Sequence, residues 1–298
     1  MRESGWGPWS QTLQRARSSD AQIPIVGRMC IECRTMAAVN LTVSEGLATI
    51  ELDRPDALNA WNLELGEELR AAVEDVAADE AVRAVLICGA GRAFSSGADL
   101  KDITGRGLTP EGHPDLHKVL TEAYHPIIAG IRRMPKPVVA AVNGPAVGIG
   151  MSLALSCDLV VAAESSYLLL AFVNIGLVAD GGSSLFVPAR VGMARAAEMA
   201  MLGERIPAPQ ALEWGLVNRV VPDAALRDEA EALARRLAAG PTRSYAGTKR
   251  QLNAMLYGRL DEQLDLEAGI QQEMAASTDF AEGVAAFLQK RQPTFRGA

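Results

Sequence analysis

Residues 136–150 read Lys-Pro-Val-Val-Ala-Ala-Val-Asn-Gly-Pro-Ala-Val-Gly-Ile-Gly. The apolar run 138–142 has no polar alternation, which is typical of a strand buried on both faces of a parallel sheet. A glycine-rich turn follows and leads into an apolar stretch, 149–156, that predicts a short helix. Backbone NH groups in such a turn can face a ligand, so we expect functional chemistry where this strand ends.

Strand and helix patterns alternate on either side of this segment. Residues 40–43 and 47–52 alternate around Ser44-Glu45-Gly46 and predict a β-hairpin. Further strands are predicted at 84–88 and 159–162, and helices at 62–78, 117–133, 194–202, 224–239, 242–256 and 260–276. This order predicts an α/β core with the last helices packed outside it.

Composition narrows the class of protein. The 298 residues carry a net charge of −7, which argues against nucleic acid or a polybasic membrane contact as partner. Hydrophobic residues make up 49% and charged residues 22%, as in ordinary globular proteins. The most apolar stretch, 137–163, is interrupted by Asn143 and Asp158, so no membrane span is predicted. We expect a soluble, cytoplasmic protein.

The cysteines do not form a recognisable framework. Cys30 and Cys33 make a CxxC pair, but a zinc site requires a second ligand pair. The other candidate ligands lie far downstream, namely Cys88, Cys157, His113, His117 and His125. We therefore predict reduced cysteines and no metal site.

The N-terminal segment 1–38 shows no sustained hydrophobic period and no continuous apolar region of a signal peptide. We expect a disordered extension that precedes the core. An organelle-targeting peptide is the alternative, although Glu3, Asp20 and Glu32 argue against it. Met29 and Met36 leave the true start open.

A second glycine-rich turn occupies residues 91–100, which read Gly-Arg-Ala-Phe-Ser-Ser-Gly-Ala-Asp-Leu. Neither turn matches a nucleotide-binding motif, because neither has the GxGxxG spacing or the Lys-Ser/Thr ending of a P-loop. Taken alone, each is compatible with a tight structural turn.

Taken together, the motifs resemble the enoyl-CoA hydratase/isomerase, or crotonase, superfamily from about Val39 to the C-terminus. They are Arg54-Pro55, Ala57-Leu58-Asn59-Ala60, the turn 94–99, the segment 136–144, Cys157-Asp158 and Trp214-Gly-Leu-Val-Asn-Arg-Val-Val-Pro222. The resemblance implies a crotonase-type spiral of ββα turns over 39–235. It also implies a C-terminal helical region, 236–298, that forms homotrimers or dimers of trimers. The substrate would be an acyl-CoA thioester, with no separate cofactor because coenzyme A is part of the substrate.

In that superfamily two backbone NH groups hold the thioester oxygen, and these positions map to Ala98 and Ile149. Preorganised donors of this kind stabilise an enolate. Most members have glycine where this chain has Ile149, so the side chain is expected to reshape the pocket. The resemblance places further substrate-binding positions at Ala57, Asn59, Ala60, Ser96, Gly97, Asp99, Leu100, Gly148, Phe172 and His125.

The catalytic carboxylate is where this chain departs from the hydratases. Their two glutamates map to Ser152 and Phe172, neither of which is acidic. Asp180 instead resembles the acid of Δ3,Δ2-enoyl-CoA isomerases and of the ring-opening isomerase of phenylacetate catabolism. One such group suffices for a 1,3-proton shift, and apolar neighbours favour its neutral form. An N-cap on the following helix is the structural alternative for Asp180.

Three other functions stay open. Hydratase activity is what the superfamily label suggests. In a dehalogenase-like reaction Asp180 would attack an aromatic ring and His125 would activate water. A non-catalytic acyl-CoA-binding role is the third, since a fold does not fix a function. Acyl chain length, aromatic or aliphatic substrate and pathway are open as well, whereas Asp158 is expected to be structural.

Overall fold

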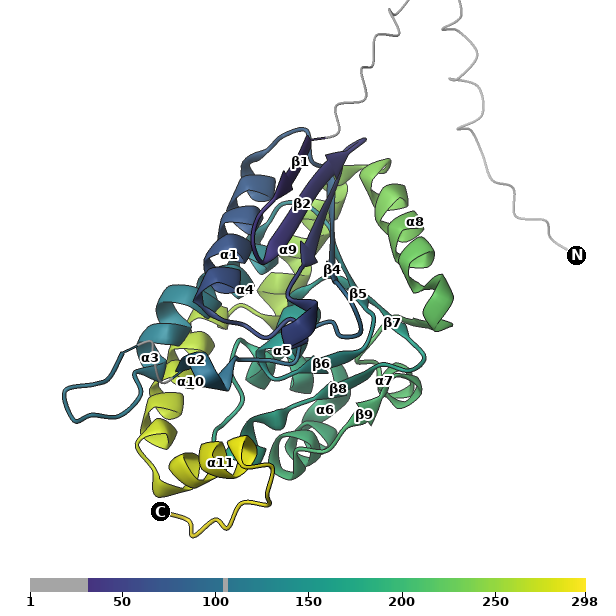
Figure 1. Cartoon of the computed structure of the whole chain (residues 1–298). Coiled ribbons are helices and arrows are strands. Elements are labelled where there is room, and N and C mark those ends of the chain that lie inside the picture. Colours follow the sequence, from purple (N-terminus) through teal and green to yellow (C-terminus); the bar gives the residue numbers. More distant parts are fainter. Residues whose placement is uncertain (1–31, 104–106) are drawn as a thin grey trace, which may run out of the picture.

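A seven-stranded sheet runs through the centre of the computed structural model, which describes residues 32–103 and 107–298 (Figure 1). The strand order is β1-β2-β3-β4-β5-β7-β10. Strands β1 to β3 are antiparallel and the later neighbours are parallel. The strands are β1 (Glu32–Thr35), β2 (Val39–Ser44), β3 (Leu47–Leu52), β4 (Ala84–Gly89), β5 (Val138–Val142), β7 (Leu159–Ala163) and β10 (Arg219–Val221).

The predicted hairpin is confirmed as β2 and β3, with Val39 opposite Leu52. Glu45 and Gly46 have φ values of 52° and 80°, the left-handed pair that a tight type I′ turn requires. Strand β1 adds to the free side of β2, with Thr35 opposite Asn40. Among the described residues, β1 (from Glu32) lies inside the segment 1–38 that we expected to be disordered, and its backbone pairing with β2 orders this part. Residues 1–31, with Cys30 and Met29, lie outside the described residues.

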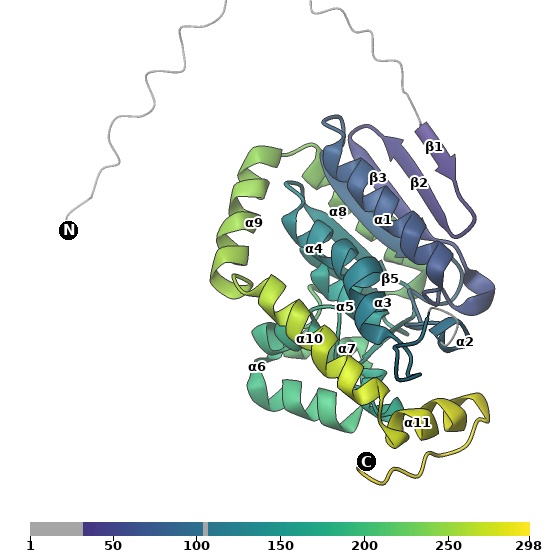
Figure 2. The same ribbon diagram turned by 90° about the vertical axis from the view of Figure 1, so that its left-hand side faces the viewer.

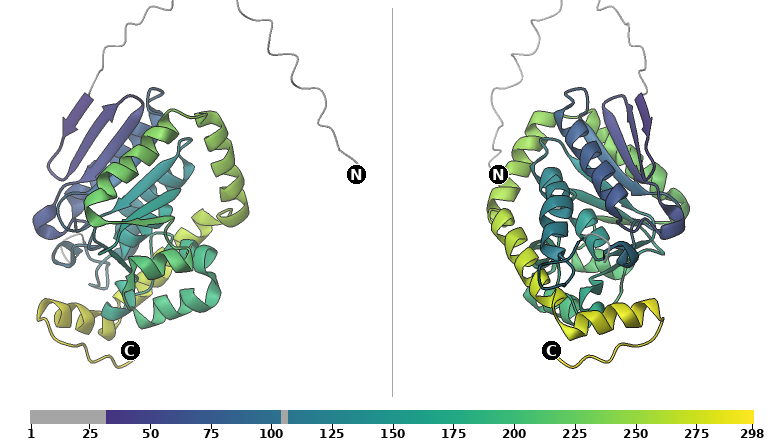
Figure 3. Two further views of the ribbon diagram at one scale, coloured as in Figure 1. Left: turned by 90° about the vertical axis from the view of Figure 1, so that its right-hand side faces the viewer. Right: turned by 60° about the vertical axis from the view of Figure 1, so that its left-hand side comes forward.

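Helices cover both faces of the parallel strands, which explains their unbroken apolar sequences. Helix α8 (Leu226–Ala238) packs on β4, β5 and β7 from one side. On the other side lie α1 (Leu63–Ala78), α4 (His125–Arg133) and α5 (Ile149–Ser156) (Figures 1 and 3). Helix α1 begins where predicted, because the Asn62 side chain accepts a hydrogen bond from the Leu65 NH at 2.9 Å.

The predicted helix 117–133 contains a π turn. It consists of α3 (Leu116–Val119), the π turn Leu120–Tyr124 and α4. Pro126 has no NH to donate to the Glu122 carbonyl, which instead accepts a hydrogen bond from Arg70 at 3.3 Å. The His125 NH reaches back to the Leu120 carbonyl. The proline thus explains why the helix widens here.

A second, three-stranded sheet was not predicted, because its strands are very short. It contains β6 (Pro145–Val147), β8 (Tyr167–Leu169) and β9 (Ile206–Pro207). The glycine-rich turn 91–100 joins the edge of this sheet, since the Ser95 NH donates to the Pro145 carbonyl at 3.0 Å and the Val147 NH donates to the Ser95 carbonyl at 2.9 Å. The two glycine-rich turns are therefore held side by side.

In Figure 2 the later helices, in green and yellow, run along one side of the sheet and gather at its lower end. They are α6 (Ser183–Leu202), α7 (Ala208–Trp214), α9 (Thr242–Leu256), α10 (Leu260–Ala275) and α11 (Thr278–Leu288). The remaining short elements are α2 (Leu100–Ile103) and the 3₁₀ turns Pro55–Ala57, Ala171–Ile175 and Asp223–Ala225. The predicted boundary between residues 235 and 236 falls inside α8. Helix α10 is not peripheral, because Glu267 and Gln271 on it are buried.

Candidate active site

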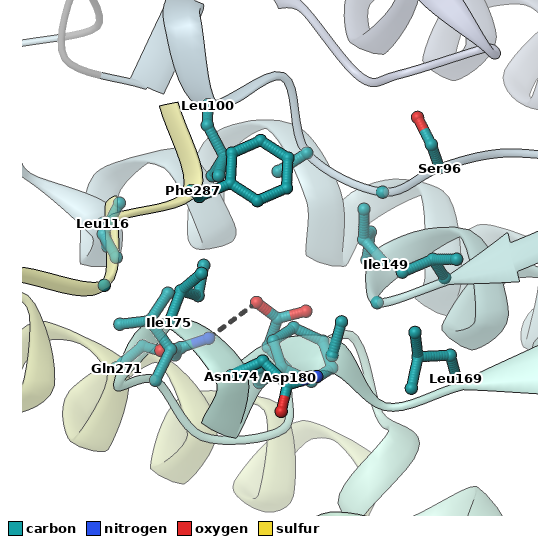
Figure 4. A pocket seen from close by; sticks show the side chains of 18 of the residues that line it. Ser96, Leu100, Leu116, Ile149, Leu169, Asn174, Ile175, Asp180, Gln271 and Phe287 are labelled. Atoms are coloured by element: carbon teal, nitrogen blue, oxygen red, sulfur yellow. Dashed lines mark hydrogen bonds between the residues drawn. The ribbon is translucent and has the colours of Figure 1, made fainter. Parts of the chain in front are cut away.

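A cavity of about 350 Å³ lies where the two glycine-rich turns meet the C-terminal helices (Figure 4). Most of its lining is apolar, including Leu116, Leu120, Leu169, Phe172, Ile175 and Leu177. Asp180 is the only carboxylic acid among the described residues that line it. A pocket with an apolar wall and few polar groups is the usual form of a small-molecule site.

Glycines allow the two turns to approach closely. A Cβ atom on Gly97, where φ is +95°, would lie 2.9 Å from the Val147 carbonyl oxygen. A Cβ atom on Gly150 would lie 2.6 Å from the Ser95 Cβ. Within the described part of the chain the NH groups of Ala98 and Ile149 donate to no protein acceptor. Both residues line the cavity, which makes their two NH groups the candidate donors to a ligand.

Hydrogen bonds to the carbonyl oxygen of Asp180 fix its backbone. This oxygen accepts hydrogen bonds from Ser152 Oγ at 2.8 Å, Ser183 Oγ at 2.8 Å and the Ser183 NH at 3.1 Å. Gly181 and Gly182 follow with φ values of 62° and 79°, a left-handed turn that glycine adopts readily. The carboxyl group is then free to face the cavity, as Figure 4 shows.

The Asp180 carboxyl group is almost completely buried. Its Oδ2 accepts a hydrogen bond from Gln271 Nε2 at 2.8 Å. Its Oδ1 has no hydrogen-bond partner among the described residues. Burial raises the pKa of Asp180 to about 8, with a further increase from Glu267, while the Gln271 bond lowers it. This increase in the pKa of Asp180 agrees with the expectation that apolar surroundings favour the neutral acid.

Glu267, and not Asp180, caps helix α6. Its carboxylate accepts hydrogen bonds from the Gly182 NH at 2.7 Å, from the Ser184 NH at 3.1 Å and from the Ser184 hydroxyl. The alternative in which the Asp180 side chain is the cap is therefore wrong. Burial raises the pKa of Glu267 to about 7. Glu267 and Gln271 lie four residues apart and so share one helix face, but this spacing does not mark that face as buried.

The predicted substrate-binding residues fall into two groups. Those that line the cavity are Ser96, Gly97, Leu100, Gly148 and Phe172, and those that do not are Ala57, Asn59, Ala60, Asp99 and His125. The side chain of Asn59 is buried and donates to the carbonyls of Ala90 and Ala93 at 3.0 and 2.8 Å, so it joins neighbouring loops. Asp99 lies 3.4 Å from the guanidinium of Arg54.

His125 requires a correction. The π turn adds a residue to the helix, and Tyr124, not His125, lines the cavity. His125 is buried, its Nε2 has no hydrogen-bond partner among the described residues, and burial lowers its pKa to about 4. Because His125 lies outside the cavity lining, the structure does not bring it together with Asp180.

The C-terminal segment also contributes to the cavity, which the sequence did not reveal. Phe287 of α11 lies across the cavity from Asp180 in Figure 4, and Arg291 and Pro293 follow at its edge. Their spacing predicts only an amphipathic helix and a tail, so no signal in the sequence marks them as part of a site.

In the described ranges, no group of three or more His, Cys, Asp or Glu side chains could hold a metal ion. No described helix combines the length and apolar character that a membrane-spanning segment requires. Cys88 and Cys157 are free thiols, and burial raises the pKa of each to about 12. Both are therefore poor nucleophiles.

The sequence pattern of the enoyl-CoA hydratase/isomerase family matches residues 42–298. A Rhodobacter capsulatus protein described as a probable enoyl-CoA hydratase is 44% identical over 87% of this chain and 98% of its own length. The 1,2-epoxyphenylacetyl-CoA isomerase of Escherichia coli is 42% identical over 86% of this chain and 97% of its own length.

A solved structure supports the same assignment. The enoyl-CoA hydratase of Mycobacterium avium subsp. paratuberculosis superposes with a TM-score of 0.79 at 39% identity, covering 88% of this chain and all of that one. The predicted α/β fold, a crotonase-type spiral with C-terminal helices, is therefore confirmed. On this sequence and structural evidence, the chain is an enzyme that belongs to the enoyl-CoA hydratase/isomerase family.

Proposed function

We propose that this enzyme moves the double bond of an enoyl-CoA thioester, with Asp180 as its single acid and base. The observation that carries the proposal is that Asp180 is the only carboxylic acid among the described cavity-lining residues. Its unpartnered Oδ1 and its raised pKa suit a group that accepts a proton and then returns it.

The proposed reaction starts from a 3-enoyl-CoA. Ionised Asp180 removes a proton from C2, and the electron pair of that C–H bond spreads over the thioester oxygen, C2 and C4. The NH groups of Ala98 and Ile149 stabilise the negative charge on the oxygen, and Ile149 begins helix α5. Protonated Asp180 then donates the same proton to C4, which forms the 2-enoyl-CoA and restores the carboxylate.

Hydration requires a second acid/base group, which the described lining of this cavity lacks. A water molecule would need one carboxylate to deprotonate it while another acid protonates C2. Ser152 Oγ is buried and donates to the carbonyl of Asp180, and the ring of Phe172 lines the wall. These contacts support isomerisation over the hydratase activity named for some relatives.

We expect conversion of a 3-enoyl-CoA to its 2-enoyl isomer, with hydration of the 2-enoyl-CoA at least about 100-fold slower, since one of two acid/base groups is missing. The measurement is chromatographic product analysis with both substrates at equal enzyme concentration. Rapid formation of 3-hydroxyacyl-CoA as the main product would contradict the proposal.

A ring-opening isomerisation is the second candidate. The 42% identical relative acts on a CoA thioester whose acyl group carries a ring epoxide, as its name states. A protonated carboxyl in an apolar cavity could also donate its proton to an epoxide oxygen. Including a ring-epoxide CoA thioester in the same product analysis separates the two substrate classes.

We also propose self-association through the C-terminal helices and α6. Large apolar side chains are exposed along these helices, as a buried interface requires. They are Met193, Met201, Leu202, Leu252, Met255, Leu256 and Leu266. The family resemblance favours a trimer or a dimer of trimers.

The proposed role of Asp180 predicts an unusual pH dependence. Because the base must be ionised and its pKa is raised to about 8, kcat/KM should rise with pH and level off only above that value. The measurement is the pH profile of kcat/KM for 3-enoyl-CoA isomerisation. A profile that is already level above about pH 5, as for an ordinary carboxyl group, would contradict a raised pKa of the base.

A further inference from the structure

Helix α10 brings one polar side chain to the proposed base. Gln271 is 1% exposed and lines the cavity beside Asp180. Its Nε2 donates two hydrogen bonds, one to the Val178 carbonyl oxygen and one to Asp180 Oδ2, each at 2.8 Å. Figure 4 shows the second of these contacts as a dashed line.

The Val178 carbonyl determines which end of the Gln271 amide faces Asp180. A backbone carbonyl oxygen only accepts hydrogen bonds, so the NH₂ group must point toward it. The second hydrogen of the same NH₂ group is directed at Asp180 Oδ2. This oxygen is therefore held as an acceptor in both protonation states of the carboxyl group.

We propose that Gln271 is a positioning residue that fixes the Asp180 carboxyl group so that Oδ1 is the atom that carries the transferred proton. The inference rests on the proposed function of Asp180 as acid and base. A proton on Oδ2 would face the NH₂ group of Gln271 across 2.8 Å, donor against donor, whereas Oδ1 has no partner among the described residues.

The other hydrogen bonds between Asp180 and the described residues hold its backbone. Ser152 and Ser183 donate to its carbonyl oxygen and leave the carboxyl group free to rotate about its side-chain bonds. The ionisable group that acts on Asp180 is Glu267, from the same helix as Gln271. Its carboxylate is already engaged with the Gly182 NH and with Ser184. Gln271 is thus the side chain that orients the base.

The direct test is Gln271→Met, which keeps the length of the side chain but removes the donor. The expected result is a fall in kcat of about 10- to 100-fold with KM nearly unchanged, because the base loses its orientation. The pH profile should also move to higher pH, because the lost hydrogen bond lowers the pKa of Asp180 in the wild type. Unchanged kcat and an unchanged profile would overturn the proposal.

Gln272→Met is the matched control. Gln272 is the next residue on α10, and its side chain donates to the Pro114 carbonyl at 3.2 Å and accepts from the His117 NH at 3.0 Å. It makes no contact with Asp180, so this variant should keep the wild-type pH profile. Equal loss of kcat in both variants would assign Gln271 a general structural role and overturn the proposal.

A measurement on the wild-type protein does not depend on the folding of a variant. In protein labelled with ¹⁵N on glutamine side chains, the Gln271 NH₂ resonance should shift with pH at the ionisation of Asp180. The shift should vanish in Asp180→Asn. A pH-independent resonance would overturn the proposal for Gln271, whereas full activity of Asp180→Asn would overturn the proposed function itself.

Discussion

Asp180→Asn is expected to lower the rate of isomerisation at least about 100-fold, the low end for the loss of a general acid/base. The amide has nearly the shape of the carboxyl group, and its oxygen can still accept the Gln271 hydrogen bond. Binding of the CoA thioester should therefore stay close to that of the wild type. The measurements are kcat on a 3-enoyl-CoA and calorimetric binding of the 2-enoyl product.

A control variant shows whether the loss of rate is specific to Asp180. Asp228→Asn changes an exposed aspartate of α8 and should leave the rate unchanged.

Asp180→Asn should also raise the melting temperature near neutral pH. Because the folded-state pKa of Asp180 is raised, its stabilising protonated form is lost as pH rises toward about 8, and the amide avoids this loss. Turnover at the wild-type rate in Asp180→Asn would remove Asp180 from the mechanism.

Asp158→Asn is expected to lower the free energy of unfolding by about 3–5 kcal/mol, because it leaves buried cations without their counter-charge. Asp158 lies 3.1 Å from Arg132 and 2.8 Å from Lys249, and both cationic side chains are 5% exposed. It also accepts a hydrogen bond from the Val138 NH at 2.9 Å. Urea denaturation of the variant and the wild type measures the difference.

Glu74→Gln is the control for Asp158→Asn. Glu74 pairs with Arg70 at 2.8 Å on the exposed face of α1, and such surface pairs contribute about 0.3–0.5 kcal/mol. If Asp158→Asn cost no more than this control, the buried ion cluster would not stabilise the fold. This result would contradict the structural role that the sequence predicts for Asp158.

The strands of the central sheet could be predicted where the hydrophobic pattern of the sequence matches the burial of the strand. Strands β4, β5 and β7 are continuous apolar runs because helices cover both of their faces, and the β2–β3 turn contains Gly46, which suits a left-handed backbone. Strands β6, β8 and β9 have two or three residues each, too few to show a period. Their pairing depends on contacts between distant segments, which the sequence pattern does not contain.

The sequence likewise predicted some residues of the candidate site and missed others. Asp180 and the two glycine-rich turns were found because the chemistry and the family motifs mark them in the sequence. Gln271 and Glu267 were missed because polar residues on an amphipathic helix are normally assigned to its solvent face. His125 was placed in the pocket from the resemblance to a dehalogenase of the superfamily, but next to the π turn it is Tyr124, not His125, that lines the cavity.

Transfer of one proton by Asp180 can be followed directly with deuterium, from C2 of the substrate to C4 of the product. A 3-enoyl-CoA that carries deuterium at both C2 positions is converted, and the product is examined by NMR and mass spectrometry. Asp180 is 6% exposed, so the same carboxyl group that removes deuterium should deliver it before exchange with water is complete. Proton transfer through Asp180 predicts a 2-enoyl-CoA with deuterium at C4 in part of the product. A product whose C4 position contains only hydrogen from solvent would contradict transfer by a single buried carboxyl group.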